Sequence, residues 1–312
     1  MFPKISVITP SLNQAAYIAA CMDSVLGQEY PNLEYIVMDG GSSDGSQEII
    51  GTYAAQLAHY VCKSNDGGQY VAIQKGFERS TGSIMAWLNA DDCYAPRAFF
   101  AVAEIFERFP EVEWLMGYPS ELNESGISFR RTNLPYARWS KYRFLTSDFQ
   151  FIGQEAVFWR RSLWERSGGC LDTRFQLAAD MELWSRFFRH ARLYSTTAVL
   201  ASFRHRQFGQ RSKDCRLQYL AECSLVVDRE LARLSWSMRL YLGILRYLGY
   251  GLGAAYFFDL PVFSFLYKCL YALPPLIGYS FERGEWYMPA RLVKHPPIYW
   301  RGKQYSWENW GK

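Results

Sequence analysis

Short apolar runs alternate with longer amphipathic stretches along the first 117 residues of the 312-residue chain. Five runs have the length and apolar character of buried strands, at 4–9, 33–39, 58–63, 83–89 and 112–117. Helical spacing separates them, as in the segment that carries one apolar stripe of Ile18, Cys21, Met22, Val25 and Leu26. Strands that alternate with helices predict a largely parallel sheet with helices on both faces.

Local signals place the starts of several helices. Asp44 is a plausible N-cap, with Gln47 completing a capping box. Pro96 is expected to open the helix at 96–109, and another helix is expected to start near Asp180. From residue 118 the pattern is otherwise irregular, with one further strand expected at 192–203.

Composition describes a globular protein with many aromatic residues. Hydrophobic residues make up 49% of the chain, aromatic residues 17% and charged residues 21%. The seven cysteines are scattered and form no Cys-x-x-Cys pair, so neither a disulfide framework nor a zinc knuckle is expected. The N-terminus lacks the basic start and apolar stretch of a secretory signal, and we expect a reducing cytoplasmic location.

The positive charge is concentrated in the C-terminal part. From Asp228 onward, eleven Lys and Arg face six Asp and Glu, whereas the preceding part is nearly neutral. The most hydrophobic stretch, 236–281, is interrupted by Arg246, Asp259 and Lys268, which argues against a clean transmembrane helix. A basic, aromatic end predicts peripheral contact with an anionic membrane at its inner, cytoplasmic face, and no nucleic-acid partner. The alternative is a set of helices that packs on the rest of the chain or on another subunit, and the oligomeric state stays open.

Acidic residues follow several of the predicted strands. Asp39 ends the second strand, Asp66 lies in the loop after the third, and the adjacent pair Asp91 and Asp92 follows the fourth. Parallel strands bring their carboxyl ends to one edge of the sheet, where ligands bind in such folds. Neighbouring carboxylates repel each other, so this edge suits a cation or a hydroxyl-rich ligand. Taken alone, an Asp-Asp pair is more typical of a solvated turn before a helix.

Four segments together carry a resemblance to a known family, at 5–50, 66–92, 158–172 and 178–187. In this order they resemble the inverting glycosyltransferases of family 2, of the non-processive bacterial type, over about residues 4 to 212. The resemblance implies a GT-A fold, which is a Rossmann-like, mostly parallel α/β sheet with helices on both faces. It also implies transfer of a hexosyl or N-acetylhexosaminyl group from a nucleotide-sugar donor, a UDP-sugar in our expectation, to a glycan or lipid-linked acceptor.

The resemblance places the nucleotide across the first half of the sheet. It implies nucleotide contacts from the Thr9-Pro10-Ser11 turn, Asp39, Gly40, Asp66, Gly67 and Asp91. Carboxylate oxygens accept hydrogen bonds from imide or hydroxyl donors, and glycines let the backbone approach the ligand.

The segment "NADD" corresponds to the metal motif of the family, which implies a Mn²⁺ or Mg²⁺ cofactor that stabilises the leaving diphosphate. The resemblance assigns Asp91 and Asp92 to metal and ribose contact, with His205 completing the metal shell. Asn89 stands where the family often has an aspartate. We therefore expect Asn89 to support the neighbouring site residues by hydrogen bonds and not to bind the metal. The remaining expected contacts are phosphate contacts from Arg204, Arg206 or Arg211 and a sugar or acceptor pocket lined by Gln154 and Trp184.

Asp180 matches the catalytic base of the family, which takes the proton from the acceptor hydroxyl. The alternative is that Asp180 only caps its helix, a place that also favours aspartate. Glu182, two residues on, points elsewhere on the helix and is the weaker candidate.

We expect a donor-binding half at 1–117, an acceptor-binding and catalytic-base half at 118–225, and a helical, aromatic-rich extension at 226–312. Three other functions have less support in the sequence. A processive polysaccharide synthase would carry Gln-x-x-Arg-Trp, but Arg138-Trp139 lacks the Gln. A sugar-1-phosphate nucleotidyltransferase would need a glycine-rich basic loop near the N-terminus, and a binding module would need no base at Asp180.

Overall fold

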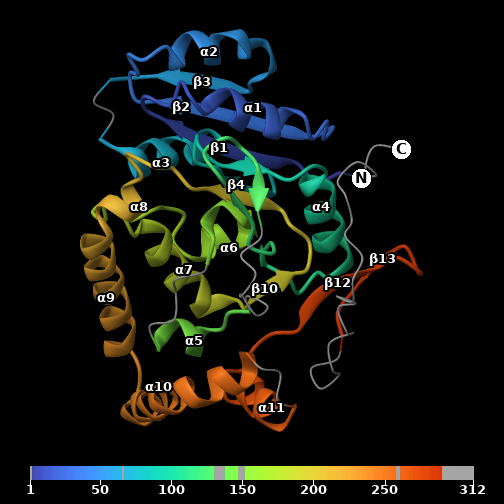
Figure 1. Cartoon of the computed structure of the whole chain (residues 1–312), viewed down its shortest axis with the longest axis vertical. Coiled ribbons are helices and arrows are strands. Elements are labelled where there is room, and N and C mark those ends of the chain that lie inside the picture. Colours follow the sequence, from blue (N-terminus) through green and yellow to red (C-terminus); the bar gives the residue numbers. More distant parts are fainter. Residues whose placement is uncertain (1, 65–66, 130–137, 147–151, 258–260, 290–312) are drawn as a thin grey trace.

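The computed structural model describes residues 2–64, 67–129, 138–146, 152–257 and 261–289. Its central sheet has nine strands in the order β13-β12-β10-β6-β9-β4-β1-β2-β3 (Figure 1). The first four strands of the chain in this sheet, β1 (Ile5–Ser11), β2 (Leu33–Asp39), β3 (His59–Cys62) and β4 (Ile84–Trp87), pair in parallel. The mixed α/β architecture with a mostly parallel sheet confirms the expected fold class.

Side chains on the two faces of the sheet enter two hydrophobic cores. On β1, Ile8 faces one core while Ile5 and Val7 face the other. Helices α1 (Ile18–Leu26) and α4 (Ala98–Arg108) cover one face, and α3 (Gln69–Arg79), α6 (Arg161–Arg166) and α7 (Ala179–His190) cover the other. Burial on both faces explains why these strands read as continuous apolar runs.

One strand in the middle of the sheet runs the other way. β9 (Val157–Arg160) pairs antiparallel with both β4 and β6 (Trp114–Met116). β10 (Leu193–Thr196) then pairs in parallel with β6. The sequence pattern did not indicate β9, because it is short and its pairing partners are distant in the chain.

A second sheet of four short strands lies beside the first. Its order is β5 (Cys93–Tyr94), β11 (Ala201–Arg204), β7 (Glu121–Leu122) and β8 (Ser128–Phe129). The single strand expected at 192–203 is therefore wrong, because residues 193–196 and 201–204 belong to different sheets.

Two helix starts also differ from expectation. α2 (Ser46–Thr52) is preceded by Gly45 as N-cap, and the Gln47 amide donates to the Ser42 carbonyl, so the capping box is absent there. Asp44 instead accepts from the backbone of Ser46 and of Ala15, which ties two loops together. α4 begins at Ala98, two residues after Pro96, because Arg97 takes a left-handed conformation with φ of 60°.

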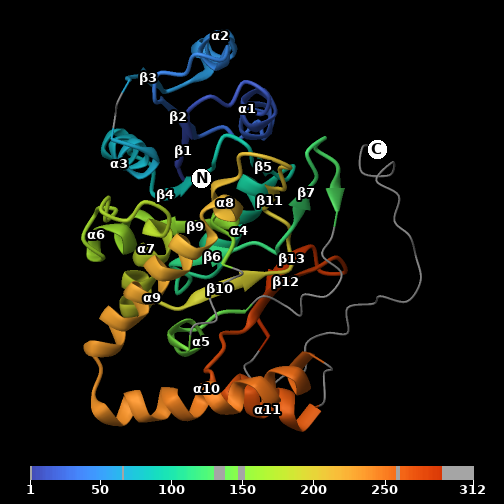
Figure 2. The same ribbon diagram turned by 60° about the vertical axis from the view of Figure 1, so that its left-hand side comes forward.

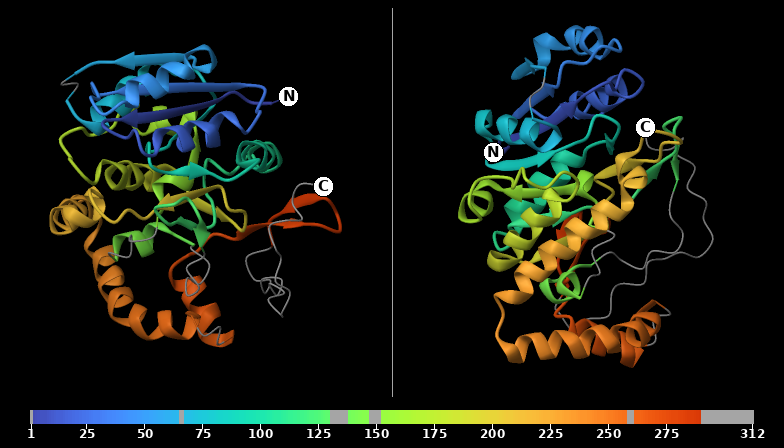
Figure 3. Two further views of the ribbon diagram at one scale, coloured as in Figure 1. Left: turned by 45° about the horizontal axis from the view of Figure 1, so that its top comes forward. Right: turned by 90° about the vertical axis from the view of Figure 1, so that its left-hand side faces the viewer.

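The C-terminal extension contains strands as well as helices. After α8 (Arg211–Asp214), the long helix α9 (Arg216–Ala232) leads to α10 (Trp236–Phe257) and α11 (Pro261–Leu270), which lie side by side at the end of the molecule opposite α2 (Figures 1 and 2). β12 (Leu276–Ser280) then joins the central sheet beside β10, and β13 (Glu285–Tyr287) pairs with it (Figure 3). No helix in the described ranges combines the length and apolar character needed to cross a membrane.

The short helix α5 (Lys141–Leu145) packs against α7 and α9 below the sheet. Two 3₁₀ turns complete the secondary structure, at Ala54–Gln56 and at Gln154–Ala156. The second of these turns leads directly into β9 and carries Gln154 and Glu155.

Candidate functional site

The carboxyl end of β4 carries Asp92, which is almost fully buried. One oxygen of its carboxylate accepts the backbone N–H of Arg204 at 2.8 Å, and the Asn89 amide lies 3.4 Å from the other. Burial raises the pKa of Asp92 well above its usual range, and the negative charges of Asp91 and Glu155 add to this effect. Asp92 therefore connects the loop after β4 to β11. Its ionised form costs free energy in this buried, negatively charged surrounding, and a nearby cation would reduce that cost.

Asp91 faces a cationic side chain from a distant segment. Its carboxylate lies 3.2 Å from the Arg206 guanidinium, which also donates to the Gln14 side chain at 3.2 Å. The same guanidinium stacks over the Tyr17 ring, 4.8 Å from its centroid. The structure thus places positive charge from the basic loop directly at the acidic pair.

Arg204 has a different place from the one expected. It is buried, and its guanidinium donates to the carbonyls of Asp91, Asn123 and Glu124. Because these donors hold backbone, the expected phosphate contact of Arg204 is wrong, and Arg206 is the arginine of this loop that faces the site.

The expected metal triad is not assembled in this geometry. His205 Nε2 lies 3.2 Å from a carboxylate oxygen of Glu121, and Asp92 is engaged with Arg204 and Asn89. Among the described residues, no group of three or more His, Cys, Asp or Glu side chains is placed to hold a metal ion. In this arrangement His205 faces Glu121, and its role as a metal ligand stays a prediction.

Asp91 still fits a different kind of metal site. Mg²⁺ and Mn²⁺ at nucleotide sites take one or two carboxylates and fill the remaining positions with phosphate oxygens and water. Asp91 offers the hard oxygen ligands that these ions prefer. The buried carboxylate of Asp92 beside it adds negative charge, which favours binding of a cation. The chemistry of Asp91 fits a metal of this kind, held jointly with the nucleotide.

An amide ladder holds Asn89 in place. Its carbonyl oxygen accepts from Gln69 at 2.8 Å, and its amide nitrogen donates to Gln154 at 3.2 Å. Gln154 in turn donates to the backbone carbonyl of Trp87 at 2.7 Å. Both Asn89 and Gln154 therefore hold the loop after β4 in place. Gln69 belongs to the same hydrogen-bonded chain of amides and was not predicted from the sequence.

The ends of β1 and β2 lie side by side, with Ser11 paired to Asp39. Asp39 is buried, and its carboxylate accepts from the backbone of Gly41 and Ser42 and from the Ser42 hydroxyl. Among the described residues the buried Ser11 hydroxyl has no hydrogen-bond partner, whereas the Thr9 hydroxyl accepts from Tyr35. Ser11 and Gly40, whose N–H donates to the Ser11 carbonyl, thus form an edge with spare bonding capacity.

A small cavity of about 90 Å³ lies where the loop after β3 meets the start of α8. Gly67, Gly68 and Arg211 line it together with Gln176, whose carbonyl lies 3.4 Å from the Arg211 guanidinium. Asp66 lies outside the described residues. The structure thus brings Gly67 and Arg211 together, although 144 positions separate them in the numbering.

Asp180 is the second residue of α7 and is partly buried. Burial raises the pKa of Asp180 to about 6, while the Met181 N–H and the Tyr70 hydroxyl partly offset that effect by stabilising the ionised form. The backbone before α7 is held by Glu222 of α9, which accepts from the N–H groups of residues 176, 177 and 178. Glu222 satisfies the three N–H groups that precede the helix, whereas Asp180 accepts the Met181 N–H of the first turn with one of its two carboxylate oxygens.

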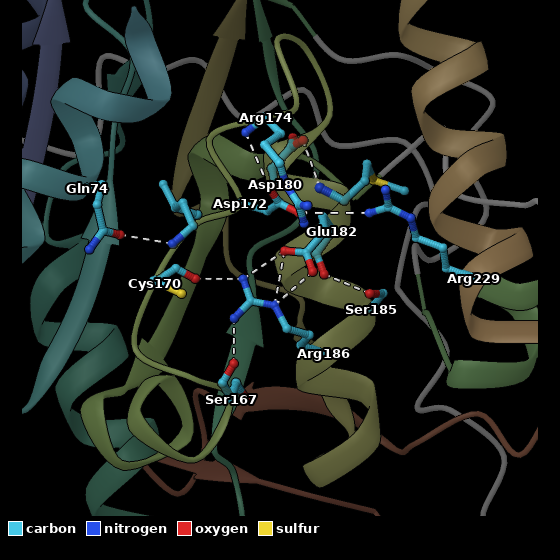
Figure 4. A network of polar contacts seen from close by, with 12 residues as sticks. Gln74, Ser167, Cys170, Asp172, Arg174, Asp180, Glu182, Ser185, Arg186 and Arg229 are labelled. Atoms are coloured by element: carbon cyan, nitrogen blue, oxygen red, sulfur yellow. Dashed lines mark hydrogen bonds and ion pairs between the residues drawn. The ribbon is translucent and has the colours of Figure 1, made fainter. Parts of the chain in front are cut away.

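The neighbouring acidic side chains are committed to arginines (Figure 4). Both oxygens of Glu182 accept from Arg186, which also donates to the carbonyls of Ser167 and Cys170. Asp172 pairs with Arg174 at 2.7 Å. Among the described residues no such ion pair involves Asp180. Unlike Asp172 and Glu182, its carboxylate is therefore not neutralised by an arginine.

Trp184 does not line a pocket, so that expectation is wrong. It is fully buried on α7 and stacks on Trp87, with ring centroids 5.8 Å apart and an angle of 11° between the planes. Trp114 and Trp159 complete the same aromatic core. Trp184 lies on the side of α7 that faces the sheet, so its assignment to a sugar or acceptor pocket did not take the helix orientation into account.

Comparison with known proteins gives a family match. Residues 6–166 match the family model described as "Glycosyl transferase family 2". The chain is 29% identical over 244 residues to a PGL/p-HBAD biosynthesis glycosyltransferase of Mycobacterium tuberculosis, covering 76% of this chain and 86% of that protein. An uncharacterized glycosyltransferase of Rickettsia prowazekii is 28% identical over 205 residues, covering 65% of this chain and 64% of the other.

Solved structures share the fold. S. aureus TarS 1–349 in complex with UDP-GlcNAc superposes with a TM-score of 0.62 at 14% identity, covering 86% of this chain and 79% of that one. The longer TarS structure is covered over only 42% of its length. The mannosyltransferase PcManGT from Pyrobaculum calidifontis, in complex with GDP-Man and Mn²⁺, gives a TM-score of 0.55 at 18% identity, covering 86% and 84%.

Proposed function

The chain belongs to glycosyl transferase family 2, and we propose that it is a metal-dependent, inverting enzyme that moves one sugar from a UDP-sugar to an acceptor hydroxyl. Asp180 is the observation that carries this proposal. Its carboxylate is partly buried, has a pKa raised to about 6 by burial, and stands apart from the arginines that bind its acidic neighbours. A base of this kind is ionised at neutral pH and still binds a proton readily.

In the proposed reaction Asp180 takes the proton of the acceptor hydroxyl. The acceptor oxygen forms a bond to the anomeric carbon from the face opposite the leaving diphosphate, and the bond from that carbon to the phosphate oxygen breaks. The products are the glycosylated acceptor with inverted configuration, the nucleoside diphosphate and one proton, which Asp180 passes to solvent.

Donor binding is assigned to the other half of the site. We assign the nucleotide to the edge formed by Thr9, Pro10, Ser11 and Gly40, where the Ser11 hydroxyl has bonding capacity to spare. Asp39 orders the turn after β2, and one of its oxygens can accept one more donor from the nucleotide. Asp66, Gly67 and Arg211 complete the donor side in this proposal.

The diphosphate is assigned to the space in front of Asp91. Asp91 would hold Mn²⁺ or Mg²⁺ together with phosphate oxygens, and the metal when bound supplies Lewis-acid stabilisation of the leaving group. Arg206, now on Asp91, would contribute a second positive charge at the same place. Asn89 and Gln154 keep the strand end rigid, and Asp92 fixes it to β11.

Residues 1–117 would thus bind the donor, and residues 118–225 would supply the base and receive a glycan or lipid-linked acceptor. All seven cysteines are free, which agrees with action in a reducing cytoplasm. The proposed donor class is supported by the fold shared with proteins crystallised with UDP-GlcNAc and GDP-Man, and the base by its local geometry.

The proposal is tested by measuring transfer and donor hydrolysis with and without Mn²⁺ for the wild type and for Asp180→Asn. Asp228→Asn, an exposed aspartate on α9, is the matched control. Loss of turnover in Asp180→Asn alone supports the assignment, and metal-dependent turnover that survives this change contradicts it. The length of the product on a defined acceptor separates transfer of one sugar from a processive polysaccharide synthase.

A further inference from the structure

The hairpin of α10 and α11 has an apolar outer face, which we define by Trp236, Leu240, Ile244 and Tyr247 on α10 with Val262 and Phe265 on α11. On α10 these residues recur at intervals of four, four and three, which places them along one side of the helix. All six are exposed, with Trp236 at 73% and Tyr247 at 86% of their full accessible area. Apolar exposure along one side of α10, with further exposed apolar residues on the α11 helix packed beside it, marks a surface that another molecule or a lipid phase covers.

The opposite side of α10 is already packed, so the outer face cannot turn inward. Leu242 and Leu245 are buried in the hydrophobic core. The Tyr271 hydroxyl donates to the Leu245 carbonyl, and the Tyr241 hydroxyl donates to the Leu270 carbonyl. These bonds lock α10 against the segment around α11 and fix which side of the helix meets the solvent.

The charges on the two helices have one sign, and Asp259 in the connection between them lies outside the described residues. Arg239 and Arg246 are exposed and seven residues apart, so they lie along the same flank of α10, beside the apolar stripe. Lys268 adds a third basic residue on α11, and neither helix sequence contains Asp or Glu. A protein partner with a mixed-charge rim would call for acidic residues here as well, whereas a surface of anionic lipid headgroups calls only for basic ones.

We propose that the outer face of this hairpin docks on an anionic membrane surface, lying in the plane of the headgroups. Trp236 and Tyr247 have the ring types that favour headgroup depth, while the wholly apolar side chains enter the acyl boundary, namely Leu240, Ile244, Val262 and Phe265. Arg239 and Arg246 then meet lipid phosphates at the rim of the stripe. Docking holds the enzyme at a surface independently of the reaction that it catalyses.

The test is co-sedimentation of the full chain with phosphatidylcholine vesicles and with vesicles in which part of the lipid is phosphatidylglycerol. We expect binding to the anionic vesicles that weakens as salt is added. Replacing both Leu240 and Ile244 by Gln removes apolar contact and should abolish binding to either vesicle. Replacing both Arg239 and Arg246 by Gln should weaken binding to anionic vesicles by about 30-fold and leave the weak binding to neutral vesicles unchanged.

Ile127→Gln is the matched control, because Ile127 is an exposed apolar residue in the turn between β7 and β8, away from the hairpin. All substituted side chains are exposed, and unchanged thermal unfolding shows that each variant folds. Absence of vesicle binding by the wild type, or binding that the hairpin variants leave unaltered, overturns the proposal. A wild type that dimerises through this face, with monomeric Leu240/Ile244 variants and no vesicle binding, assigns the face to a second copy and overturns it equally.

Discussion

The ends of β2 and β4 both carry aspartate, but the fold uses the two carboxylates differently. Asp39 accepts three donors from the turn that directly follows it. Asp91 instead faces Arg206, which comes from a loop more than a hundred residues later. Most of the bonding capacity of a strand-end carboxylate can therefore go to its own turn, as at Asp39, or face the space in which a ligand binds, as at Asp91, and the surrounding donors show which use dominates.

Asp180 belongs with Asp91 in this comparison. Glu222 binds the backbone before α7, and the Asp180 carboxylate accepts the Met181 N–H but pairs with no arginine among the described residues. Burying such a group has a cost in stability, which is typical of residues retained for chemistry.

The largest effect is expected from Asp180→Asn. Loss of the proposed base should lower kcat by about 10² to 10⁴-fold, measured by transfer to a defined acceptor. Because the folded state binds the proton of Asp180 more tightly than the unfolded state, its contribution to stability falls as the pH rises from about 4 to about 6. The variant should therefore unfold at a higher temperature than the wild type at pH 8 and not at pH 4. A variant that is inactive and less stable at pH 8 would point to a structural role instead.

Asp91→Asn should come next. Weakening one oxygen ligand is expected to lower activity by at least about tenfold and to raise the Mn²⁺ concentration needed for half-maximal rate. A titration of rate with Mn²⁺ at saturating donor measures both. If the Mn²⁺ dependence of this variant equals that of the wild type, Asp91 does not differ from Asp39 in the way described above.

Asp39→Asn should act mainly on stability. Its carboxylate serves buried turn donors, so the free energy of unfolding should fall by about 1–3 kcal/mol, measured by urea denaturation. The Mn²⁺ requirement should stay that of the wild type. A variant of full stability with only a weakened affinity for donor would show that Asp39, like Asp91, faces the ligand.

The smallest effect is expected in the pH profile. The rate should rise with pH through about 6, as Asp180 loses its proton. The Tyr70 hydroxyl lowers the pKa of Asp180, so Tyr70→Phe should move this limb to higher pH by a fraction of a unit. A profile that stays flat from pH 5 to 8 in the wild type would argue against Asp180 as the titrating base.

Local patterns in the sequence were enough for the main elements. The apolar runs gave β1 to β4 and β6, and the helix start near Asp180 was correct, because hydrophobic period and helix signals act over a few residues. β9 was not predicted, because four residues are too few to show a hydrophobic period. Its place between β4 and β6 depends on pairing with strands that are distant in the sequence.

The same limit applies to the candidate site. The resemblance led to Asp91, Asp180 and the glycines of the loops, but it said nothing of the partners of each side chain. Arg204 and Arg206 looked equivalent in sequence as phosphate contacts, and His205 as a metal ligand, yet the partners of Arg204 and His205 at 121 to 124 were visible only in the fold. Trp184 shows the opposite error, in which an aromatic residue of the core was mistaken for part of a pocket.

The most direct test of the central claim is a crystal of the protein grown with UDP and Mn²⁺ and measured at a wavelength where manganese scatters anomalously. We predict a manganese peak bonded to the Asp91 carboxylate and the diphosphate, with Arg206 moved from Asp91 toward a phosphate oxygen and Asp180 open to the acceptor side. A diphosphate bound without contact to Asp91, or a manganese peak elsewhere on the molecule, would contradict the account.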